Sequence, residues 1–450
     1  MGPKGKHHST GDLFQQPLAE LINLKHPLVK LAELIDWSVF ETRWAEFFPS
    51  RTGRPASSPR LIAGLLYLQH TFACSDEDLV WTWVENPYWQ HFCGETYFRH
   101  EPPIDPSSMT RWRQRVGTDG VERLLMETIE AARRGKVVKA KSFEKIIIDT
   151  TVMEKAVAYP TDSRLLERAR QHLVKLASTL GITLRQNYNR EAPRLAVQVG
   201  RYAHAKQFRR MRGCLKSLRT VVGRVWRDID RKLDRQDEVQ CAKAVSILAR
   251  VKRLLEQKPK DKNKLYSLHA PEVECIAKGK ARQPYEFGVK VTVATTHKEG
   301  LVVGMRSMPG NPYDGHTLPE AIEQVSTLTA QKPKAVFVDK GYRGIRVDGV
   351  TIWRSGQKRG VTPSIRKAIH RRSAVEPVIG HMKNEGKLRR NWLKGSLGDA
   401  LNAVLCGAGH NLRMILRAIR LFCVWILCFA NAENNSRQSP CPEFRHFAVI

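Results

Sequence analysis

The sequence predicts a mixed α/β protein with an all-α N-terminal domain and a helical insertion within the α/β part. Its 450 residues, 42% of them hydrophobic, are enough for two or three domains with a buried core. Short β-branched or apolar runs at 146–148 and 335–338 have the length and composition of buried strands. Between these runs, apolar residues recur at three- and four-residue spacing, which indicates amphipathic helices.

The N-terminal domain, residues 1–140, is predicted to be helical. Its helix start signals are a Ser or Asp followed by proline or by acidic residues, at Ser58-Pro59, Ser75 and Asp105-Pro106. The segment SSMTRWRQRVG places Arg111 and Arg113 on either side of Trp112. This helix could lie in a DNA groove, or it could be a basic surface helix that Trp112 anchors to the core. Both interpretations stay open.

The α/β domain is predicted from two segments, 141–163 and 266–420. A strand leads into Asp149, and two further strands joined by HKEG have the pattern of a β-hairpin. A helix, a strand leading into Asp339, a short strand and a closing helix complete the order. The expected elements are strands at 146–149, 285–296, 301–309, 335–338 and 350–355, and helices at 317–328 and from 373 onward.

The insertion, residues 164–265, is the most basic part of the chain. Its stretch 164–264 holds 27 Lys and Arg against 9 Asp and Glu, and the whole chain has a formal charge of +31. A bias of this size favours contact with a polyanion, nucleic acid first, over a merely solvated basic face.

Other features of the composition restrict the class of protein. The first 16 residues have no apolar segment typical of a secretion signal, so a cytoplasmic location is expected. Nine scattered cysteines without a C-x-x-C pair indicate neither a disulfide framework nor a zinc site. The apolar run at 421–430 is too short to span a bilayer. We interpret it as a packing helix at the start of a C-terminal tail, 421–450.

Three carboxylates are candidates for a shared site. Asp149 and Asp339 each follow a predicted strand, and Glu376 lies one turn into the closing helix. If the two strands are parallel neighbours, their carboxylates meet at one edge of the sheet, where oxygen ligands suit two Mg²⁺ or Mn²⁺ ions. Each residue also has a purely structural interpretation, for Asp149 a turn and for Glu376 a capping box with Ser373.

The segments around these acids resemble the DDE motif of bacterial insertion-sequence transposases. The resemblance includes DKGYRG around Asp339 and RRSAVEPVIGHMK around Glu376, and it extends over roughly residues 15–420. N-terminal segments that are similar to the same group are RPASSPRLIAGLLYLQH, WVENPYWQHFCGE and DPSSMTRWRQRVG. The resemblance implies an RNase H-like mixed sheet flanked by helices.

It also implies roles for individual residues. Asp149, Asp339 and Glu376 would be the catalytic metal ligands. The family pattern Y-x2-R-x3-E-x6-K is matched by Arg372, Glu376 and Lys383, so that Arg372 and Lys383 would bind DNA phosphates. The tyrosine of that pattern is replaced by Ile369. Tyr342 is a candidate to supply the missing DNA contact, together with Arg343, and Arg111 and Arg113 are expected to bind DNA in the N-terminal domain.

The expected activity is metal-dependent cleavage at the terminal inverted repeats of an insertion sequence, followed by strand transfer. The expected partner is double-stranded DNA, both transposon ends and target. A homodimer in the DNA complex and association with the bacterial nucleoid are further expectations. The insertion would clamp DNA or mediate dimerisation. Two alternatives stay open: a catalytically inactive DNA-binding relic or repressor, which the departure at Ile369 and the atypical tail suggest, and an RNase H-like nuclease.

Overall fold

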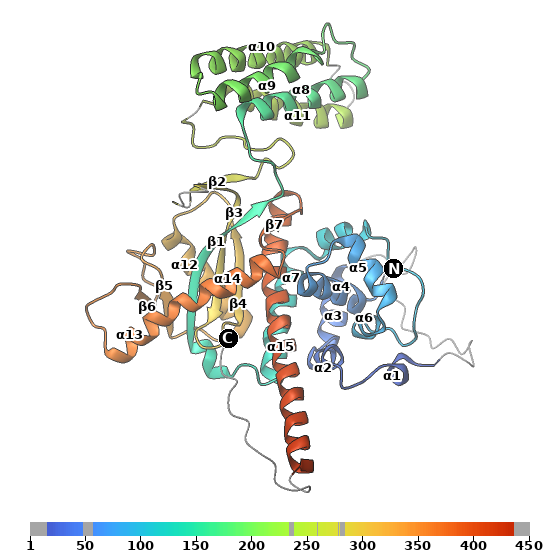
Figure 1. The fold of residues 1–450 in the computed structure, drawn as a ribbon, viewed down its shortest axis with the longest axis vertical. Coiled ribbons are helices and arrows are strands. Elements are labelled where there is room, and N and C mark those ends of the chain that lie inside the picture. The colour runs from blue at the N-terminus through green and yellow to red at the C-terminus, as the bar shows by residue number, and fades with distance from the viewer. Residues whose placement is uncertain are drawn as a thin grey trace.

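The N-terminal part of the molecule is a cluster of seven α-helices. The computed structural model describes residues 16–47, 57–233, 238–258, 260–277, 279 and 284–435. The helices are α1 Leu18–Leu21, α2 Pro27–Leu34, α3 Ser38–Arg43, α4 Pro59–Phe72, α5 Asp76–Glu85, α6 Pro87–Phe92 and α7 Ser108–Arg134 (Figure 1). As the sequence predicts, Ser75 caps α5 by accepting a hydrogen bond from the Asp78 amide at 3.0 Å. Helix α7 continues far beyond the basic segment and changes direction at Gly117, whose φ is 61°.

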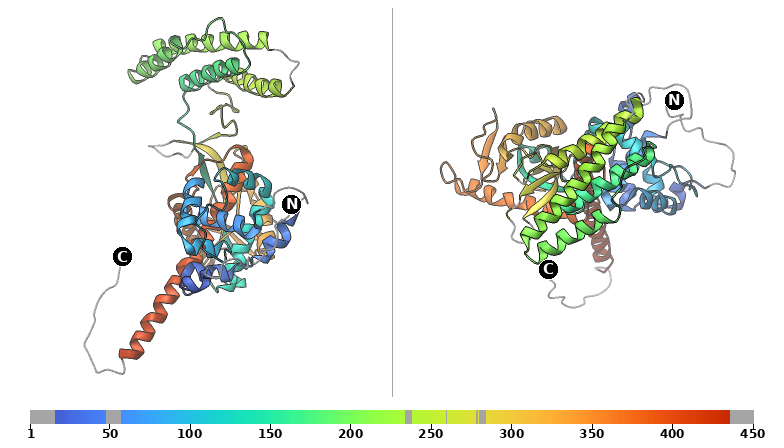
Figure 2. Two further views of the ribbon diagram at one scale, coloured as in Figure 1. Left: turned by 90° about the vertical axis from the view of Figure 1, so that its right-hand side faces the viewer. Right: turned by 90° about the horizontal axis from the view of Figure 1, so that it is seen from above.

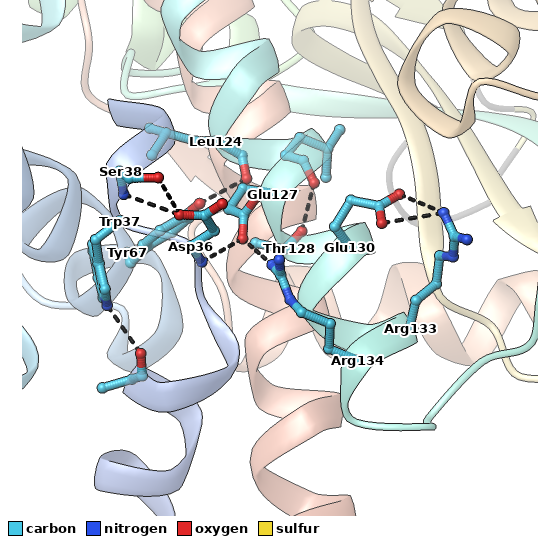
Figure 3. Close-up of polar contacts among 12 residues, drawn as sticks. Asp36, Trp37, Ser38, Tyr67, Leu124, Glu127, Thr128, Glu130, Arg133 and Arg134 are labelled. Atoms are coloured by element: carbon cyan, nitrogen blue, oxygen red, sulfur yellow. Dashed lines mark hydrogen bonds and ion pairs between the residues drawn. The ribbon is translucent and has the colours of Figure 1, made fainter. Parts of the chain in front are cut away.

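Polar contacts join α7 to the helices before it (Figure 3). The buried Glu127 carboxylate accepts hydrogen bonds from the Asp36 amide at 2.7 Å and from the Arg134 guanidinium. The Tyr67 hydroxyl donates to the Leu124 carbonyl at 2.8 Å. Burial raises the pKa of Glu127 more than these donors lower it. The contacts position α7 against α4, and α7 then leads directly into the sheet.

The sheet is mixed, as predicted. Its order is β2-β3-β1-β5-β6, with β4 also paired to β3 and β7 to β1. Strand β1 is antiparallel to β3 and parallel to β5, and β5 is parallel to β6. The strands are β1 Lys145–Lys155, β2 Glu274–Ala277, β3 Tyr285–Thr296, β4 Val302–Met308, β5 Ala335–Val338, β6 Thr351–Arg354 and β7 Arg390–Asn391.

One prediction about the sheet is wrong. Strand β1 does not end at Asp149, because it stays paired with β3 as far as Glu154. The two threonines after Asp149 therefore lie inside the strand, where β-branched residues fit well.

The remaining helices cover the sheet. They are α12 Leu318–Thr329, α13 Pro363–His370, α14 Val375–Asn384 and α15 Gly395–Asn435. A single hydrophobic core extends from the N-terminal helices through the sheet to α15. Helix α15 continues across position 421, where the sequence suggested that a tail begins, and residues 436–450 lie outside the described part. Within the described ranges, no helix combines the length and the apolar character that a membrane crossing requires.

The insertion is a four-helix bundle with a hydrophobic core of its own. Its helices are α8 Asp162–Thr179, α9 Glu191–His204, α10 Phe208–Lys232 and α11 Glu238–Glu256. Figures 1 and 2 show the bundle set apart from the sheet, with α9 and α10 on the side away from it. The chain enters the bundle from the end of β1. There the buried Lys155 ammonium pairs with Asp399 at 2.7 Å and with Glu272 at 2.9 Å.

Candidate active site

Two carboxylates are brought to one level of the sheet by the pairing of β1 with β5. Ile147 is the register partner of Phe337 in this parallel pair. Asp149 and Asp339 each lie two residues beyond that pair, so their side chains leave adjacent strands on the same face. Asp149 is held within β1 by its pairing with β3, and Asp339 directly follows the last residue of β5.

The third carboxylate comes from α14. Val375 is fully buried and packs with Ile147 and Phe337, which fixes the start of the helix on the sheet. Glu376 is the next residue, and 66% of its side chain is exposed. The structural interpretation of Glu376 as part of a capping box is wrong, because the N-cap is Ala374 and no side chain caps the helix. The Ser373 hydroxyl instead donates to the His370 carbonyl at 3.1 Å.

Arg372 contacts all three carboxylates. One of its terminal nitrogens, Nη1, lies 3.0 Å from Asp149 Oδ2, and the other, Nη2, lies 3.8 Å from Asp339 Oδ1 and 3.5 Å from Glu376 Oε1. Only 13% of the Arg372 side chain is exposed, against 19% for Asp149 and 50% for Asp339. The guanidinium is therefore a cation enclosed by three carboxylates, and the sequence pattern alone did not predict this arrangement.

The segment that carries Arg372 is anchored by its neighbour. Arg371 donates from Nε to the His297 carbonyl at 2.9 Å and from Nη2 to the Lys298 carbonyl at 2.5 Å. The His297 ring nitrogen Nε2 lies 2.9 Å from the Ala368 carbonyl. These bonds attach the end of α13 to the turn between β3 and β4, so that Arg372 is directed toward the sheet edge.

The electrostatics of Asp149 reflect its position. Burial raises the pKa of its carboxyl group, and the nearby charge of Asp339 acts in the same direction. The Thr150 amide, which donates to Asp149 Oδ1 at 2.9 Å, and the Arg372 guanidinium lower the pKa, but burial has the larger effect. A carboxylate in such surroundings is stabilised by any additional positive charge placed next to it.

The donor set suits a hard divalent cation. All three side chains offer carboxylate oxygens, which are ligands that Mg²⁺ and Mn²⁺ prefer, and all three already face a cationic group. Among the described residues, no group of three or more His, Cys, Asp or Glu is arranged to hold a metal ion. What supports a divalent cation here is that the three side chains are all carboxylates and that all three contact the same Arg372 guanidinium.

The prediction that Tyr342 contacts DNA needs correction. Its ring is buried, with 1% of the residue exposed. Burial and the neighbouring carboxylates of Asp149 and Asp314 raise the pKa of its hydroxyl. The ring therefore packs in the hydrophobic core, close to Asp149 and Asp314. Arg343, the other residue of this segment expected to contact DNA, is exposed and lines a small pocket of about 320 Å³ together with Lys340 and Arg354.

Asp314 is a carboxylate near the site that the sequence did not reveal. It accepts hydrogen bonds at 3.0 Å from the Thr150 hydroxyl and from the Lys290 ammonium. It also lies beside the loop after β5, because a Cβ atom added at Gly341 would be 3.3 Å from Asp314 Oδ2. An Asp-Gly pair after a hairpin is an ordinary turn sequence, so its local pattern carried no functional signal.

A large cleft lies between the N-terminal helices and the segment after α14. Its volume is about 740 Å³, and Lys383, Arg389 and Arg390 are among its lining residues. The Arg390 guanidinium lies 4.8 Å from the ring centroid of Trp392, which is 67% exposed. The segment after α14 therefore presents cations beside an exposed aromatic ring, a combination that suits nucleic acid, whereas α5 contributes Asp76, Glu77 and Asp78 to the same cleft.

Arg113 also lines this cleft, but its expected role in DNA binding needs correction. Its side chain is only 4% exposed and pairs with Asp76, with Nη1 lying 2.9 Å from Asp76 Oδ2. Its Nη2 donates to Gln69 Oε1 at 2.7 Å. Arg113 thus joins α7 to α4 and α5. Trp112 is buried, as the surface-helix interpretation expects, and Arg111 is exposed to solvent.

Comparisons with known proteins agree with this arrangement. Residues 16–115 match a family described as "Transposase domain (DUF772)", and residues 257–397 match a family described as "Transposase DDE domain". A protein of Rhizobium meliloti, described as "Uncharacterized protein ORF8 in nfe locus", is 48% identical over 208 residues, which are 46% of this chain and all of that protein. No solved structure matches the chain.

The match to the DDE domain includes Asp339, Arg372, Glu376 and Lys383, whereas Asp149 lies outside both matched segments. The pairing of β1 with β5 brings Asp149 close to Asp339, and both contact Arg372. A DDE domain implies an RNase H-like fold, in agreement with the mixed sheet. Enzymes with this domain use divalent metal ions and act on DNA. The chain therefore belongs to the insertion-sequence transposases of the DDE family.

Proposed function

We propose that this transposase binds the terminal inverted repeats of its own insertion sequence, cleaves the DNA there and transfers the freed strand to target DNA. The observation that carries the proposal is the convergence of Asp149, Asp339 and Glu376 on the Arg372 guanidinium. Asp149 and Asp339 come from adjacent parallel strands and Glu376 from a helix packed on them. The fold therefore holds the three acids together without a contribution from another chain.

The three carboxylates would hold the divalent cations, most simply two Mg²⁺ or Mn²⁺ ions. When bound, such ions activate the attacking oxygen and stabilise the leaving oxygen in phosphodiester cleavage. In the first step, water attacks the phosphorus and the bond to the 3′ oxygen breaks, which leaves a 3′-hydroxyl and a 5′-phosphate. In the second, that hydroxyl attacks a phosphodiester of the target, and the displaced 3′ oxygen takes up a proton.

The other residues of the site would position the DNA. The Arg372 guanidinium has the planar fork that suits a phosphate, and it lies next to the acids that would flank the scissile bond. Lys383 lies seven residues after Glu376 on α14, about 10 Å along the helix axis, and lines the large cleft. A duplex entering this cleft would meet Lys383, Arg389 and Arg390 along its backbone. Arg343 and Arg111 are further exposed candidates for phosphate contact.

The test is cleavage of DNA that carries the ends of the element. Wild type, Asp339→Asn and Asp348→Asn are incubated with this DNA in Mg²⁺ or in EDTA. Asp348 is an exposed acid nine residues after Asp339 in the same connection between β5 and β6, so its variant is a matched control. We expect nicking at the end that requires Mg²⁺, persists in Asp348→Asn and is lost in Asp339→Asn.

The alternatives give other outcomes in the same assay. Binding without cleavage by the wild type, in Mg²⁺ and in Mn²⁺, would establish a DNA-binding relic or repressor. Cleavage that never yields joined target DNA would establish an RNase H-like nuclease.

We also propose that two copies hold the paired ends, because strand transfer needs both ends together. Mass measurement of the complex with DNA tests this, and one copy per pair of ends would contradict it.

A further inference from the structure

One end of the helical bundle has no hydrophobic core. We define the basic tip as residues 200–217, which include the end of α9, the turn after it and the start of α10. Within the bundle, the core residues of α10 begin at Leu218, and the last buried residue of α9 is Val199. No residue of the tip is buried. Within residues 200–217, all of which the structure describes, only the partly buried Leu215 packs against the bundle core, so core packing accounts for little of this extension of α9 and α10.

The composition of the tip is strongly one-sided. It contains six Lys and Arg residues and no Asp or Glu: Arg201, Lys206, Arg209, Arg210, Arg212 and Lys216. All six are exposed. Within the described residues, none of the six forms an ion pair with a carboxylate. Arg210 donates to the Gln207 side chain at 3.1 Å and Arg212 to the Phe208 carbonyl at 3.3 Å, both neighbours in the same segment.

Three of these cations form a stripe on α10. Arg209, Arg212 and Lys216 are spaced three and four residues apart, so they lie on one face of the helix. The stripe spans about 10 Å along the axis, at 1.5 Å per residue. Like charges at this spacing repel one another, and a partner with regularly spaced negative charges removes that repulsion. The phosphates of a DNA strand provide such a series.

We propose that the basic tip is a second DNA-binding surface, which holds the duplex backbone outside the segment engaged at the carboxylates. This inference rests on the proposed function, since it takes the same DNA as substrate. Figures 1 and 2 place the bundle apart from α14 and from the sheet, so the tip meets a different stretch of the duplex. A second copy of this chain is the less suitable partner, because two tips with six cations each would repel.

The salt dependence of DNA affinity tests the proposal. Each phosphate contact contributes about −0.9 to the slope of log K against log salt concentration. The triple variant Arg209→Gln, Arg212→Gln, Lys216→Gln should therefore reduce the magnitude of the slope by about 2 to 3. Between about 50 and about 200 mM salt, the wild type would then lose about 15- to 60-fold more affinity than the variant. The matched control, Lys252→Gln, Lys258→Gln, Lys262→Gln, removes the same charge from other exposed positions of the insertion and should leave the slope unchanged.

The full-length variants are compared on one duplex of about 40 base pairs that carries an element end. An unchanged slope in the tip variant, or an equal change in the control, would overturn the inference. So would a DNA-free wild-type dimer that the tip substitutions dissociate, because the tip would then bind a second copy. Circular dichroism establishes that both variants are folded, as expected for substitutions of exposed residues. Cleavage at the end is measured in parallel. If the wild type does not cleave but the tip substitutions still reduce the salt slope, only the proposed function is contradicted. If the wild type cleaves and the tip substitutions leave the slope unchanged, only this inference is contradicted.

Discussion

Replacing Arg372 with alanine tests whether its guanidinium is the charge that allows three carboxylates to lie together. Arg372 Nη1 and Asp149 Oδ2 are 3.0 Å apart, and both side chains are mostly buried. A hydrogen bond to a charged partner contributes about 1.5–3 kcal/mol to stability. In EDTA, we therefore expect Arg372→Ala to lower the free energy of unfolding by about 2 kcal/mol. For a cooperative unit of about 150–250 residues, this is a fall in melting temperature of about 4–8 °C.

Added Mg²⁺ should change this difference. An ion that binds only the folded protein, at a free concentration of about 100 times its Kd, stabilises it by about 2.7 kcal/mol. Because Arg372→Ala has no guanidinium among its carboxylates, Mg²⁺ should raise its melting temperature more than it raises that of the wild type. Arg372→Lys keeps the charge without the planar fork and should give intermediate values.

The assay is a pair of thermal melts, in EDTA and in Mg²⁺, for the wild type and the two variants. The reasoning would be refuted by an Arg372→Ala variant that melts with the wild type in EDTA. It would also be refuted if Mg²⁺ raised both melting temperatures equally.

Three further predictions concern stability and binding. Gly288→Ala should abolish folding, because the added Cβ would lie 2.0 Å from the Met153 carbonyl oxygen. In Gly213→Ala, within α10, the added Cβ meets nothing within 4 Å, so this variant should be more stable than the wild type by about 0.5–1 kcal/mol and should melt at a higher temperature. Burial lowers the pKa of His410 from 6.5 to about 4 in the folded protein. Between these two pH values the unfolded chain therefore binds more protons at this histidine than the folded chain does. Stability should then fall by up to about 3 kcal/mol as the pH drops to about 4, and His410→Gln should flatten this dependence in urea titrations at several pH values. Arg113→Gln should lower the melting temperature and leave the salt slope of DNA affinity unchanged, whereas Arg111→Gln should reduce that slope by about 1 without destabilising the fold.

The sequence was informative where function depends on local pattern. The strand before Asp339 and the helix that carries Glu376 both have the periodicity and boundaries of such elements, and both are present. The mixed sheet followed from the order of these elements. Asp149 was expected at a strand end because the β-branched run 146–148 stops before it, yet its pairing with β3 continues the strand. That pairing is made with residues far along the chain, so no local signal announced it.

Residues whose role depends on a distant partner were interpreted less well. The sequence suggested that Arg113 binds DNA, whereas the structure shows that it pairs with Asp76 on another helix. Tyr342 lies between two exposed or partly exposed neighbours in sequence, and only the packing beneath the sheet edge shows that it is buried. Asp314 and the bridging position of Arg372 depend in the same way on contacts between separate elements.

The attachment of the bundle to β1 has a mechanical consequence. From Asp149 to Lys155 the strand runs without a break for about 20 Å, at about 3.3 Å per residue, and six further residues connect it to the first helix of the bundle. The Lys155 ammonium secures the far end through Asp399 and Glu272. A pull on the bundle therefore passes first through residues 156–161, which have no regular secondary structure. From Lys155 onward it is borne by a hydrogen-bonded strand that leads to the Asp149 carboxylate.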